Sequence, residues 1–509
     1  NVASNIVKIL YCISATDGTN TYSGNNDLVV GNVYGGHKAG VVTTNTNLNI
    51  GNGLMQNVFG GGNQAQVGNT NVQIIGGTMD NVYGGGNAAG VNTNTILNIM
   101  GGTINTNAYG GGNEGTVTGD TSVNFNNGTI TGSIYAGGNG STAIVSGNTN
   151  ITVSGTAVVG YSGCTPPASG SVFGGGNAAA TGNSTNNNSK ATVNIAGGTI
   201  YGNVYGGANT SVVYGTTELN IGAGVPTSST VIKSDLLING TVFGGGEANA
   251  SGSDTYDYSF ISVTNGITVN INGLNYNNFT INGSIFGSGD ASSTTGTSHI
   301  NISNYGTYAN PKRNVSIQRT NLLVIDNSAI LLNGATDRTN EYSNVLFTLS
   351  LIDELDLKNN STLYLKTGSN LLKCFKSLNS DSTLATVTID DANSTVTKST
   401  DNRLYMLQGK NLNIATNESV TSYGEVYGMT FFGMFSIDSS NEVHTGIYNQ
   451  SFNYGDTLSW GDVFNNGSYV LGLHKTNHDI NADGFYSNFM DEDTTTNKVK
   501  VITPTPESS

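Results

Sequence analysis

Two acidic residues in one long insertion come closest to a catalytic pattern in this sequence. Asp254 and Asp257 lie close together in the segment 248–260, and Asp235 and Glu247 precede them. Two carboxyl groups hydrolyse a glycosidic bond when they flank it at a separation of about 5 Å or about 6.5 to 9.5 Å. Lys and Arg are almost absent around them, which disfavours a lyase that must neutralise an acidic sugar. Two interpretations stay open, catalytic acids of a polysaccharide-degrading enzyme and solvated loop acids.

A second candidate site is a calcium loop near the C-terminal end. Asp479, Asn481 and Asp483 have the D-x-N-x-D-G spacing in which alternate oxygens converge on the ion, and Gly484 permits the sharp turn. The twelfth position holds Met490 where a bidentate Glu belongs. The segment therefore predicts either a calcium site or an Asx-rich turn. Calcium is the one cofactor that we consider for this chain.

A column of aromatic residues could bind ligands by stacking. These residues are Tyr34, Phe59, Tyr83, Tyr109, Tyr135, Phe173, Tyr205, Phe243 and Phe286. On an exposed platform, sugar rings would stack on Tyr83, Tyr109, Tyr135 and Tyr205. The free interchange of Phe and Tyr argues against a required hydroxyl. An internal or groove-lining stack is the other interpretation.

The scaffold that would position these side chains is a repeat. A V-[YF]-G-G-G-N box at Val58 recurs at Val82 and, with Ala in place of Val, at Ala108, which gives steps of 24 and 26 residues. Nine copies, the later ones with insertions, begin at Val33, Val58, Val82, Ala108, Ile134, Val172, Val204, Val242 and Ile285. Most copies are followed by an alternating segment such as 46–50 and a G-T-I piece such as 102–104. The alternation predicts a strand with one face inward.

Short strands joined by Gly and Asn turns predict one coil of a β-solenoid in each unit. The fold class that we expect is all-β, a parallel β-helix with a C-terminal β-rich extension or cap, because the unit is too short for a propeller blade. We expect the glycines of the box to take positive φ at a corner. Asn columns should hydrogen-bond along the stack as amide ladders do in cross-β packing. The first predicted ladder is Asn63, Asn87, Asn113, Asn139, Asn177 and Asn209, and the second is Asn49, Gln73, Asn98, Asn124, Asn194, Asn220, Asn270 and Asn301.

The low charge of the chain agrees with such a stack. Only 10% of the residues are Asp, Glu, Lys or Arg and the net charge is −15, whereas an average soluble domain has about 25% charged residues. Equivalent residues of successive coils lie about 4.8 Å apart, so like charges would repel along a column. With 18 Lys and Arg the chain lacks the basic surface that nucleic acid requires. No apolar run is long enough to span a bilayer, so we expect neither a nucleic-acid partner nor membrane insertion.

The V-[YF]-G-G-G-N and G-G-T-I pieces resemble the repeat regions of very large secreted surface proteins of gut and rumen bacteria. The expected architecture is similar to adhesin-type parallel β-helices. The resemblance covers about 300 residues and implies an extracellular, modular protein of the cell surface. Its implied partners are glycans, host or neighbouring-cell surfaces, or further copies of itself. The resemblance implies no catalytic residues.

Composition divides the chain into three regions. Residues 1–310 are the Gly- and Asn-rich β-helix. In 311–440 the box vanishes and N-S pieces at Asn327, Asn360 and Asn393 recur with a step of 33 residues, which predicts larger coils or a β-sandwich. Residues 441–509 are expected to form a C-terminal β module that ends in a Thr/Pro linker.

These patterns favour an adhesin-like bacterial surface protein that displays loops from a stiff rod. The insertions expected to carry the contacts are 161–169, 181–190, 222–235 and 251–260. Two alternatives remain. One is a polysaccharide-degrading enzyme on the same scaffold, with Asp254 and Asp257 as its acids, and the other is a self-assembling matrix or filament subunit.

Overall fold

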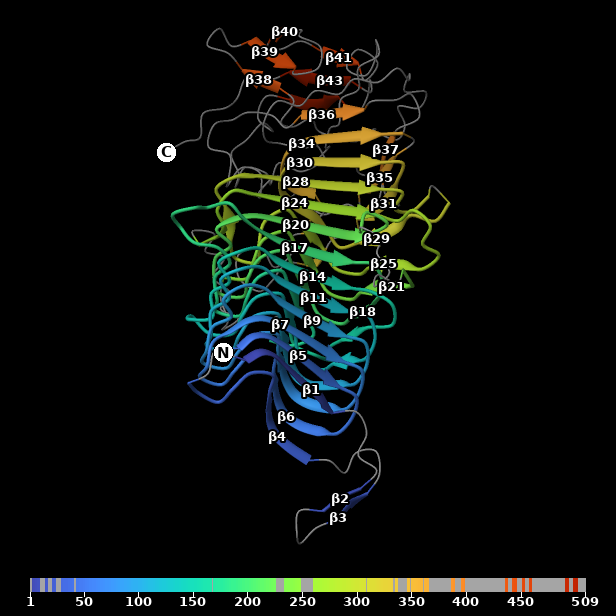
Figure 1. Cartoon of the computed structure of the whole chain (residues 1–509). Coiled ribbons are helices and arrows are strands. Elements are labelled where there is room, and N and C mark those ends of the chain that lie inside the picture. Colours follow the sequence, from blue (N-terminus) through green and yellow to red (C-terminus); the bar gives the residue numbers. More distant parts are fainter. Residues whose placement is uncertain are drawn as a thin grey trace. The chain divides into compact units, whose positions relative to one another are not determined.

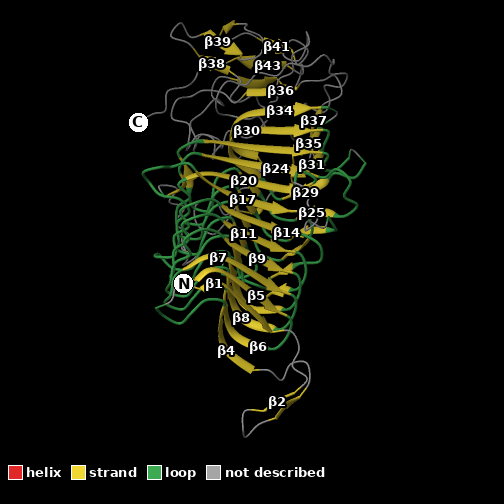
Figure 2. Cartoon of the chain, viewed as in Figure 1, coloured by secondary structure: helices red, strands yellow, loops and turns green. Residues whose placement is uncertain are grey.

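The computed structural model is all-β: its described residues form strands, turns and bends and no helix (Figure 2). No described segment is a helix long and apolar enough to cross a membrane. Contacts divide the chain into two units, Asn1–Ser298 and His299–Ser509. The described residues are 2–9, 14–16, 21–23, 29–40, 43–166, 168–225, 233–248, 260–307, 309–332, 335–336, 346–347, 349–359, 361–365, 386–389, 395–398, 435–437, 442–445, 451–453, 457–459, 490–493 and 498–501.

The first unit is a parallel β-helix in which every coil contributes strands to three faces (Figure 1). The face that we call the amide face consists of β1 (Val2–Ile9), β5 (Thr43–Ile50), β7 (Val67–Ile74), β9 (Thr95–Ile99), β11 (Thr121–Phe125), β14 (Thr149–Val153), β17 (Ser189–Ile195), β20 (Gly215–Gly222) and β24 (Gly266–Asn272). Each of these strands pairs in parallel with the equivalent strand of the next coil. The predicted fold class is confirmed.

The G-T-I pieces form the second face and the V-[YF] pairs form the third, which we call the aromatic face. The second face contains β12 (Thr129–Ile130), β15 (Val158–Val159), β18 (Gly198–Ile200), β21 (Leu236–Ile238) and β25 (Phe279–Ile281). The aromatic face contains β4 (Val29–Tyr34), β13 (Ile134–Tyr135), β16 (Val172–Phe173), β19 (Val204–Tyr205), β22 (Val242–Phe243) and β26 (Ile285–Phe286). In four coils one strand runs through both faces, namely β4, which pairs along its length with β6, and then β6 (Leu54–Phe59), β8 (Thr78–Tyr83) and β10 (Thr103–Tyr109). Smaller pairs are the hairpin β2 (Ser14–Thr16) with β3 (Thr21–Ser23) and the parallel pair β23 (Ile261–Val263) with β27 (Ser293–Thr294).

Period-2 alternation places the apolar residues of the amide face in the core. In β11, Thr121, Val123 and Phe125 are buried, while Ser122 and Asn124 lie on the outer side. Val123 and Phe125 are completely inaccessible to solvent. Each such coil therefore buries an aliphatic or aromatic pair against the other faces, and this burial is the main stabilising contribution.

The box requires glycine because there is no room for a Cβ, and not because the backbone is left-handed. The expectation of positive φ at these glycines is wrong, because positive values occur instead in the G-G-T pieces, for example 85° at Gly102. A Cβ on Gly60 would lie 2.2 Å from the carbonyl oxygen of Gly84 in the next coil. Successive coils therefore approach so closely at the box that a side chain would meet backbone.

A buried Thr in most amide-face strands donates a hydrogen bond across the core to the chain that follows the aromatic face. The backbone amides of Gly60 and Gly61 donate to the carbonyls of Tyr83 and Gly85 in the next coil. Neither of these two amides donates to the carbonyl of Gly84, which lies between those of Tyr83 and Gly85. The Thr70 hydroxyl donates to that carbonyl at 2.6 Å. The same bond, at 2.5 to 2.7 Å, joins Thr46 to Gly60, Thr95 to Gly110, Thr121 to Ala136, Thr149 to Gly174, Thr217 to Gly244 and Ser298 to Gly287.

The predicted ladder after the glycines is confirmed. In this ladder, which we call the box ladder, each Asn after the first donates its Nδ2 to Oδ1 of the Asn in the preceding coil at 2.8 to 3.0 Å. The members are Asn63, Asn87, Asn113, Asn139, Asn177 and Asn209. All five bonds run in one direction, so every Oδ1 is turned toward the following coil.

The second unit contains wider parallel coils followed by antiparallel strands. One parallel set is β28 (Thr297–Ser303), whose first two residues still belong to the first unit, β30 (Ile317–Asp326), β34 (Leu349–Lys358) and β36 (Thr386–Ile389). The other is β29 (Lys312–Asn314), β31 (Ala329–Leu332), β35 (Thr362–Leu365) and β37 (Thr395–Lys398). Ala329 pairs with Thr362 and Thr362 with Thr395, which matches the predicted step of 33 residues. The antiparallel strands are β38 (Phe435–Ile437), β39 (Glu442–Thr445), β40 (Ser451–Asn453), β41 (Thr457–Ser459), β42 (Met490–Asp493) and β43 (Lys498–Val501), and the pair β32 (Ala335–Thr336) with β33 (Leu346–Phe347) is antiparallel too.

We expect removal of a buried Thr hydroxyl to destabilise the protein. Thr121→Val keeps the branched shape but leaves the buried carbonyl of Ala136 without a donor. We expect the free energy of unfolding to fall by about 1 to 3 kcal/mol, as for other unsatisfied buried polar groups. Denaturant unfolding followed by circular dichroism measures the change.

The matched control is Thr118→Val, because the Thr118 side chain is exposed. An equal loss of stability in both variants would contradict a special role for the buried hydroxyl. Ala191 stands at the Thr position in one coil, so Ala191→Thr offers the reverse substitution and is expected to be neutral or stabilising.

Candidate functional site

The aromatic column is an internal stack. Consecutive rings lie 4.5 to 5.0 Å apart between centroids, with interplanar angles of 1° to 20°. The four tyrosines predicted as ligand contacts, Tyr83, Tyr109, Tyr135 and Tyr205, are 6%, 3%, 2% and 0% exposed. The ring faces contact the equivalent rings of neighbouring coils, because the coil spacing is close to the distance at which aromatic rings stack. These four tyrosines therefore do not form an exposed platform, and both faces of each ring are covered by neighbouring rings.

Buried tyrosine hydroxyls are hydrogen-bonded to neighbouring amides. Asn107 Nδ2 donates to the Tyr109 hydroxyl at 3.0 Å, and Asn203 Nδ2 donates to that of Tyr205 at 2.9 Å. Burial raises the pKa of Tyr83 to about 12. Burial also raises the pKa of Tyr135 to about 12, although hydrogen bonds from Ser133 and Asn209 oppose the change. These hydroxyls are structural groups that stay neutral at physiological pH.

The remaining predicted site residues are not brought together in the described part of the chain. Asp254 and Asp257 lie outside the described residues, and so do Asp479, Asn481 and Asp483 of the calcium loop. Asp235 and Glu247, which could have joined the acid pair, occupy different surroundings. Asp235 is exposed at the start of β21 and accepts a hydrogen bond from Asn278 at 2.9 Å, whereas Glu247 is buried in the column after the box glycines.

The surface best suited to bind a ligand is the outer side of the amide face. Its outward residues lie in register from coil to coil, and one column contains Asn49, Gln73, Asn98, Asn124, Thr152, Asn194, Asn220 and Asn270. This column matches the second predicted ladder, with Thr152 as an interruption. Asn301, the last predicted member, lies in β28 of the second unit, where it pairs with Val324.

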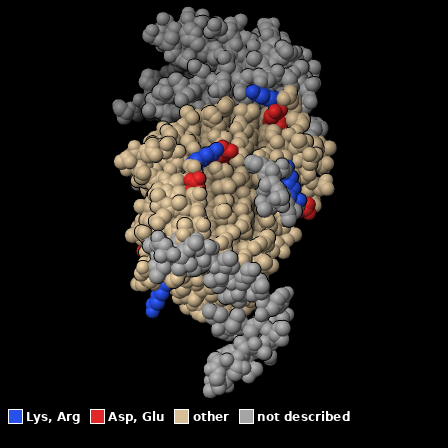
Figure 3. Space-filling view, viewed as in Figure 1, with Lys and Arg blue, Asp and Glu red and all other residues tan. Residues whose placement is uncertain are grey.

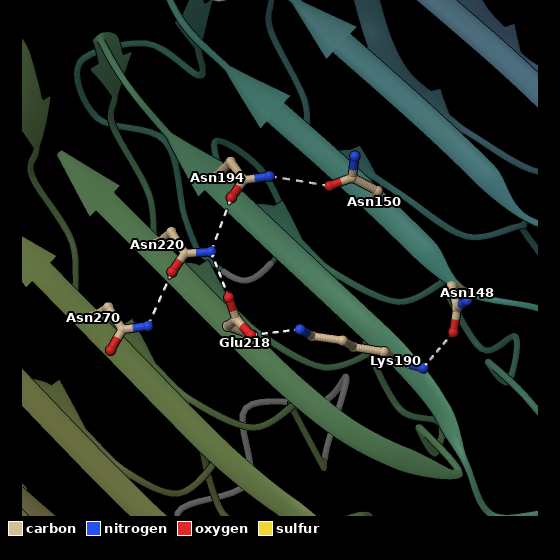
Figure 4. Close-up of polar contacts among 7 residues, drawn as sticks. All are labelled: Asn148, Asn150, Lys190, Asn194, Glu218, Asn220 and Asn270. Atoms are coloured by element: carbon tan, nitrogen blue, oxygen red, sulfur yellow. Dashed lines mark hydrogen bonds and ion pairs between the residues drawn. The ribbon is translucent and has the colours of Figure 1, made fainter. Parts of the chain in front are cut away.

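Hydrogen bonds connect much of this second ladder. Asn124 Nδ2 donates to Asn98 Oδ1 at 2.9 Å. Asn220 Nδ2 donates to Asn194 Oδ1 at 3.1 Å, and Asn270 Nδ2 donates to Asn220 Oδ1 at 2.9 Å (Figure 4). The amide groups are thereby held at the coil spacing on strands whose inner residues are fixed in the core.

Charge is scarce on this face (Figure 3). An ion pair joins Lys190 Nζ to Glu218 Oε2, and it crosses between β17 and β20 (Figure 4). Burial raises the pKa of Glu218, but hydrogen bonds from Lys190 and Asn220 and the Lys190 charge outweigh it, so the pKa lies below its ordinary value. Because the two charges cancel, the face is electrically neutral here as well.

The face is most open between β7 and β14. Asn71 and Ile96 are exposed and Asn98 and Asn124 are half-buried, whereas Asn220 is only 7% exposed. An amide that uses one N–H and one lone pair in the ladder still has a second N–H and a second lone pair. The open part therefore presents alternating donors and acceptors without charge, which suits a ligand rich in neutral hydroxyl groups.

Two features of the polar columns are not among those predicted from the sequence. The first is the buried Thr of the amide-face strands, although Thr recurs in the sequence at Thr46, Thr70 and Thr121. The second is the end of the box ladder, where Glu247 and Asp290 occupy the position of the ladder amides. The signal was present in both cases, since G-G-G-E and G-S-G-D replace G-G-G-N in the last two boxes.

Comparison of the chain with protein-family models, with curated proteins and with solved structures found no match. In the described residues, His, Cys, Asp and Glu side chains nowhere gather in a group of three or more that could hold a metal ion. The assignment of function therefore depends on the geometry of the amide face.

Because the buried tyrosines have raised pKa values, we expect the protein to lose stability as the pH rises above 10. Their pKa in the folded state is above the value of 10.0 for an exposed tyrosine, so the unfolded chain releases its protons first as the pH rises. The stability due to Tyr83 and Tyr135 is thus complete below pH 10 and is lost between about pH 10 and pH 12. Tyrosinate absorbance and circular dichroism, recorded together, should show these residues ionising only as the β-signal disappears.

Tyr135→Phe is the matched variant, because Phe173 already occupies the next position of the stack. Its alkaline transition should move to higher pH than that of the wild type. Complete ionisation of the tyrosines with an unchanged β-signal would show that the stack admits hydroxide and would contradict the prediction.

Proposed function

We propose that this protein is an adhesin-like β-helix of the bacterial cell surface that binds neutral glycans. The coil stack is a stiff scaffold, and the open part of the amide face with the loops beside it is the contact surface. The observation that carries the proposal is the neutral, regularly spaced amide surface between β7 and β14.

The interior supports the role of a rigid scaffold. Aromatic rings stack from Tyr34 to Phe286, and the box ladder runs from Asn63 to Asn209 with each amide bonded to the next. These columns join successive coils through side chains in addition to the backbone pairing. A scaffold of this kind holds surface groups at fixed positions, which lowers the entropy lost on binding.

The chemistry of the face supports a neutral, hydroxyl-rich ligand. Sugar hydroxyls donate and accept hydrogen bonds, and the free N–H and lone pair of each amide offer both. Ile96 adds an apolar side chain that is 42% exposed in the middle of the open part. An acidic polysaccharide finds no cluster of cations there, since the Lys190 charge is already paired with Glu218.

Two insertion loops have the order needed for display. In 181–190, Asn183 Oδ1 accepts hydrogen bonds from the backbone amides of Thr185 and Asn186 at 3.1 and 3.0 Å. In 161–169, Tyr161 is 50% exposed and its carbonyl accepts a bond from the Cys164 amide. The predicted loop 251–260 lies almost entirely outside the described residues, and the loop 222–235 is described only in part.

The experiment is a binding assay on a panel of immobilised neutral and acidic glycans. Asn124→Val removes an amide of the open face but keeps a good strand residue, and we expect it to weaken binding to neutral glycans about tenfold, the effect of losing roughly 1.4 kcal/mol. The matched control is Asn105→Val, because Asn105 is an exposed Asn of β10 on a different face. The control should bind as the wild type does.

The same assay separates the alternatives. Equal weakening in both Asn variants, or loss of binding only in Tyr161→Ala, would remove the amide face as the contact surface. Release of reducing ends that disappears in Asp254→Asn or Asp257→Asn would identify a polysaccharide-degrading enzyme. Failure to bind any glycan, combined with concentration-dependent assembly in sedimentation, would identify a matrix subunit.

A further inference from the structure

The box ladder ends on an acceptor that has no donor. Asn209 donates its Nδ2 to Asn177 Oδ1 at 2.8 Å, so its Oδ1 is turned toward the following coil. In the preceding coils that oxygen accepts from the next Asn, as Asn139 Oδ1 does from Asn177 at 2.9 Å. Asn209 is only 8% exposed, and its Oδ1 has no hydrogen-bond partner. A buried carbonyl group without a partner is costly, so something is expected to satisfy it.

The residues that follow in this column are two acids. Asn209 pairs with Glu247 in the next coil, and Glu247 pairs with Asp290 in the coil after that. An ionised carboxyl group only accepts hydrogen bonds, so it cannot replace the Asn donor. Glu247 is 4% exposed, and its Oε2 accepts a bond from the Tyr205 hydroxyl at 3.4 Å.

The column thus brings together the amide oxygen of Asn209 and two acidic residues of the following coils. Carboxyl groups in successive coils about 4.8 Å apart repel each other unless a positive charge lies between them. The sequence from residue 234 to residue 311 contains no Lys and no Arg.

We propose that the column binds a divalent cation of the calcium class, held by Asn209 Oδ1 and the carboxyl groups of Glu247 and Asp290. Amide and carboxylate oxygens are the ligands that calcium prefers, and calcium accepts irregular geometry with water completing its shell. The cation satisfies the orphan oxygen of Asn209 and neutralises both acids. It differs from the calcium loop at Asp479, Asn481 and Asp483, and it does not depend on the proposed glycan binding.

Terbium is a suitable probe, because it replaces calcium and emits when a nearby tyrosine absorbs. The Tyr205 hydroxyl lies beside Glu247 and supplies that tyrosine. We expect calcium-displaceable emission from the full chain, at least a tenfold loss of terbium affinity in Glu247→Gln and in Asp290→Asn, and no change in the control Glu218→Gln. Tyr205→Phe should reduce the emission, while isothermal titration still detects the cation.

A repaired ladder gives a second, independent readout. In Glu247→Asn the new Nδ2 can donate to Asn209 Oδ1, as the amides of earlier coils do. The wild type should unfold at a higher temperature in calcium than in chelator, by at least about 2 °C. Glu247→Asn should lose this difference and be at least as stable in chelator as the wild type.

Two results would overturn the proposal. The first is a wild type whose unfolding temperature is the same in calcium and in chelator and which binds no terbium, because the acids would then be held neutral by protons. The second is terbium binding that survives Glu247→Gln and Asp290→Asn but is lost in Asp479→Asn or Asp483→Asn, because the ion would then belong to the C-terminal loop.

Discussion

The structure depends on the close approach of each coil to the next. In the described strands of the first unit, paired residues of neighbouring coils lie about 4.8 Å apart, so each side chain must pack against the side chain at the same position of the next coil. Glycine satisfies this condition where backbones touch, and a Cβ at Gly60 would meet Gly84. Asn satisfies it because its amide both donates and accepts. Aromatic rings satisfy it by stacking, whereas side chains of like charge repel each other at this distance.

This constraint also decides where binding chemistry can lie. The rings from Tyr34 to Phe286 and the box ladder are used up in contacts between coils. The Thr hydroxyls are likewise used in joining two faces across the core, as Thr70 does with Gly84. Groups that remain available are on the outer side of the amide face and in the loops, where an amide retains a second hydrogen and a second lone pair.

The periodicity of the sequence made the fold predictable, but it did not predict which residues of a short strand are buried. The step of 24 to 26 residues predicted the coils, and the Asn spacing predicted both ladders, because a register of parallel strands follows directly from the repeat. A pair such as Val82-Tyr83 is too short to show which residue is buried, and in fact both are. The prediction of positive φ at the box glycines failed for a physical reason. Glycine is required at Gly60 because the neighbouring coil leaves no room for a Cβ, and this crowding cannot be seen in the sequence of one repeat unit. The backbone at Gly60 is not left-handed. Chemistry expected at Asp254 and Asp257 lies outside the described residues.

Departures from a column are informative in a protein built this way, and their consequences depend on what is lost. Ala191 replaces a Thr and removes only one donor within the core, so the change can be absorbed by neighbouring coils. Glu247 replaces an Asn and removes a donor, adds a negative charge and leaves the oxygen of Asn209 unsatisfied, all in a buried position. A neighbouring copy of the repeat cannot repair such a change, because Asp290 in the next coil repeats the charge. The repair must then come from outside the column, and for this reason an irregular position in a self-complementary stack is where a ligand is best sought.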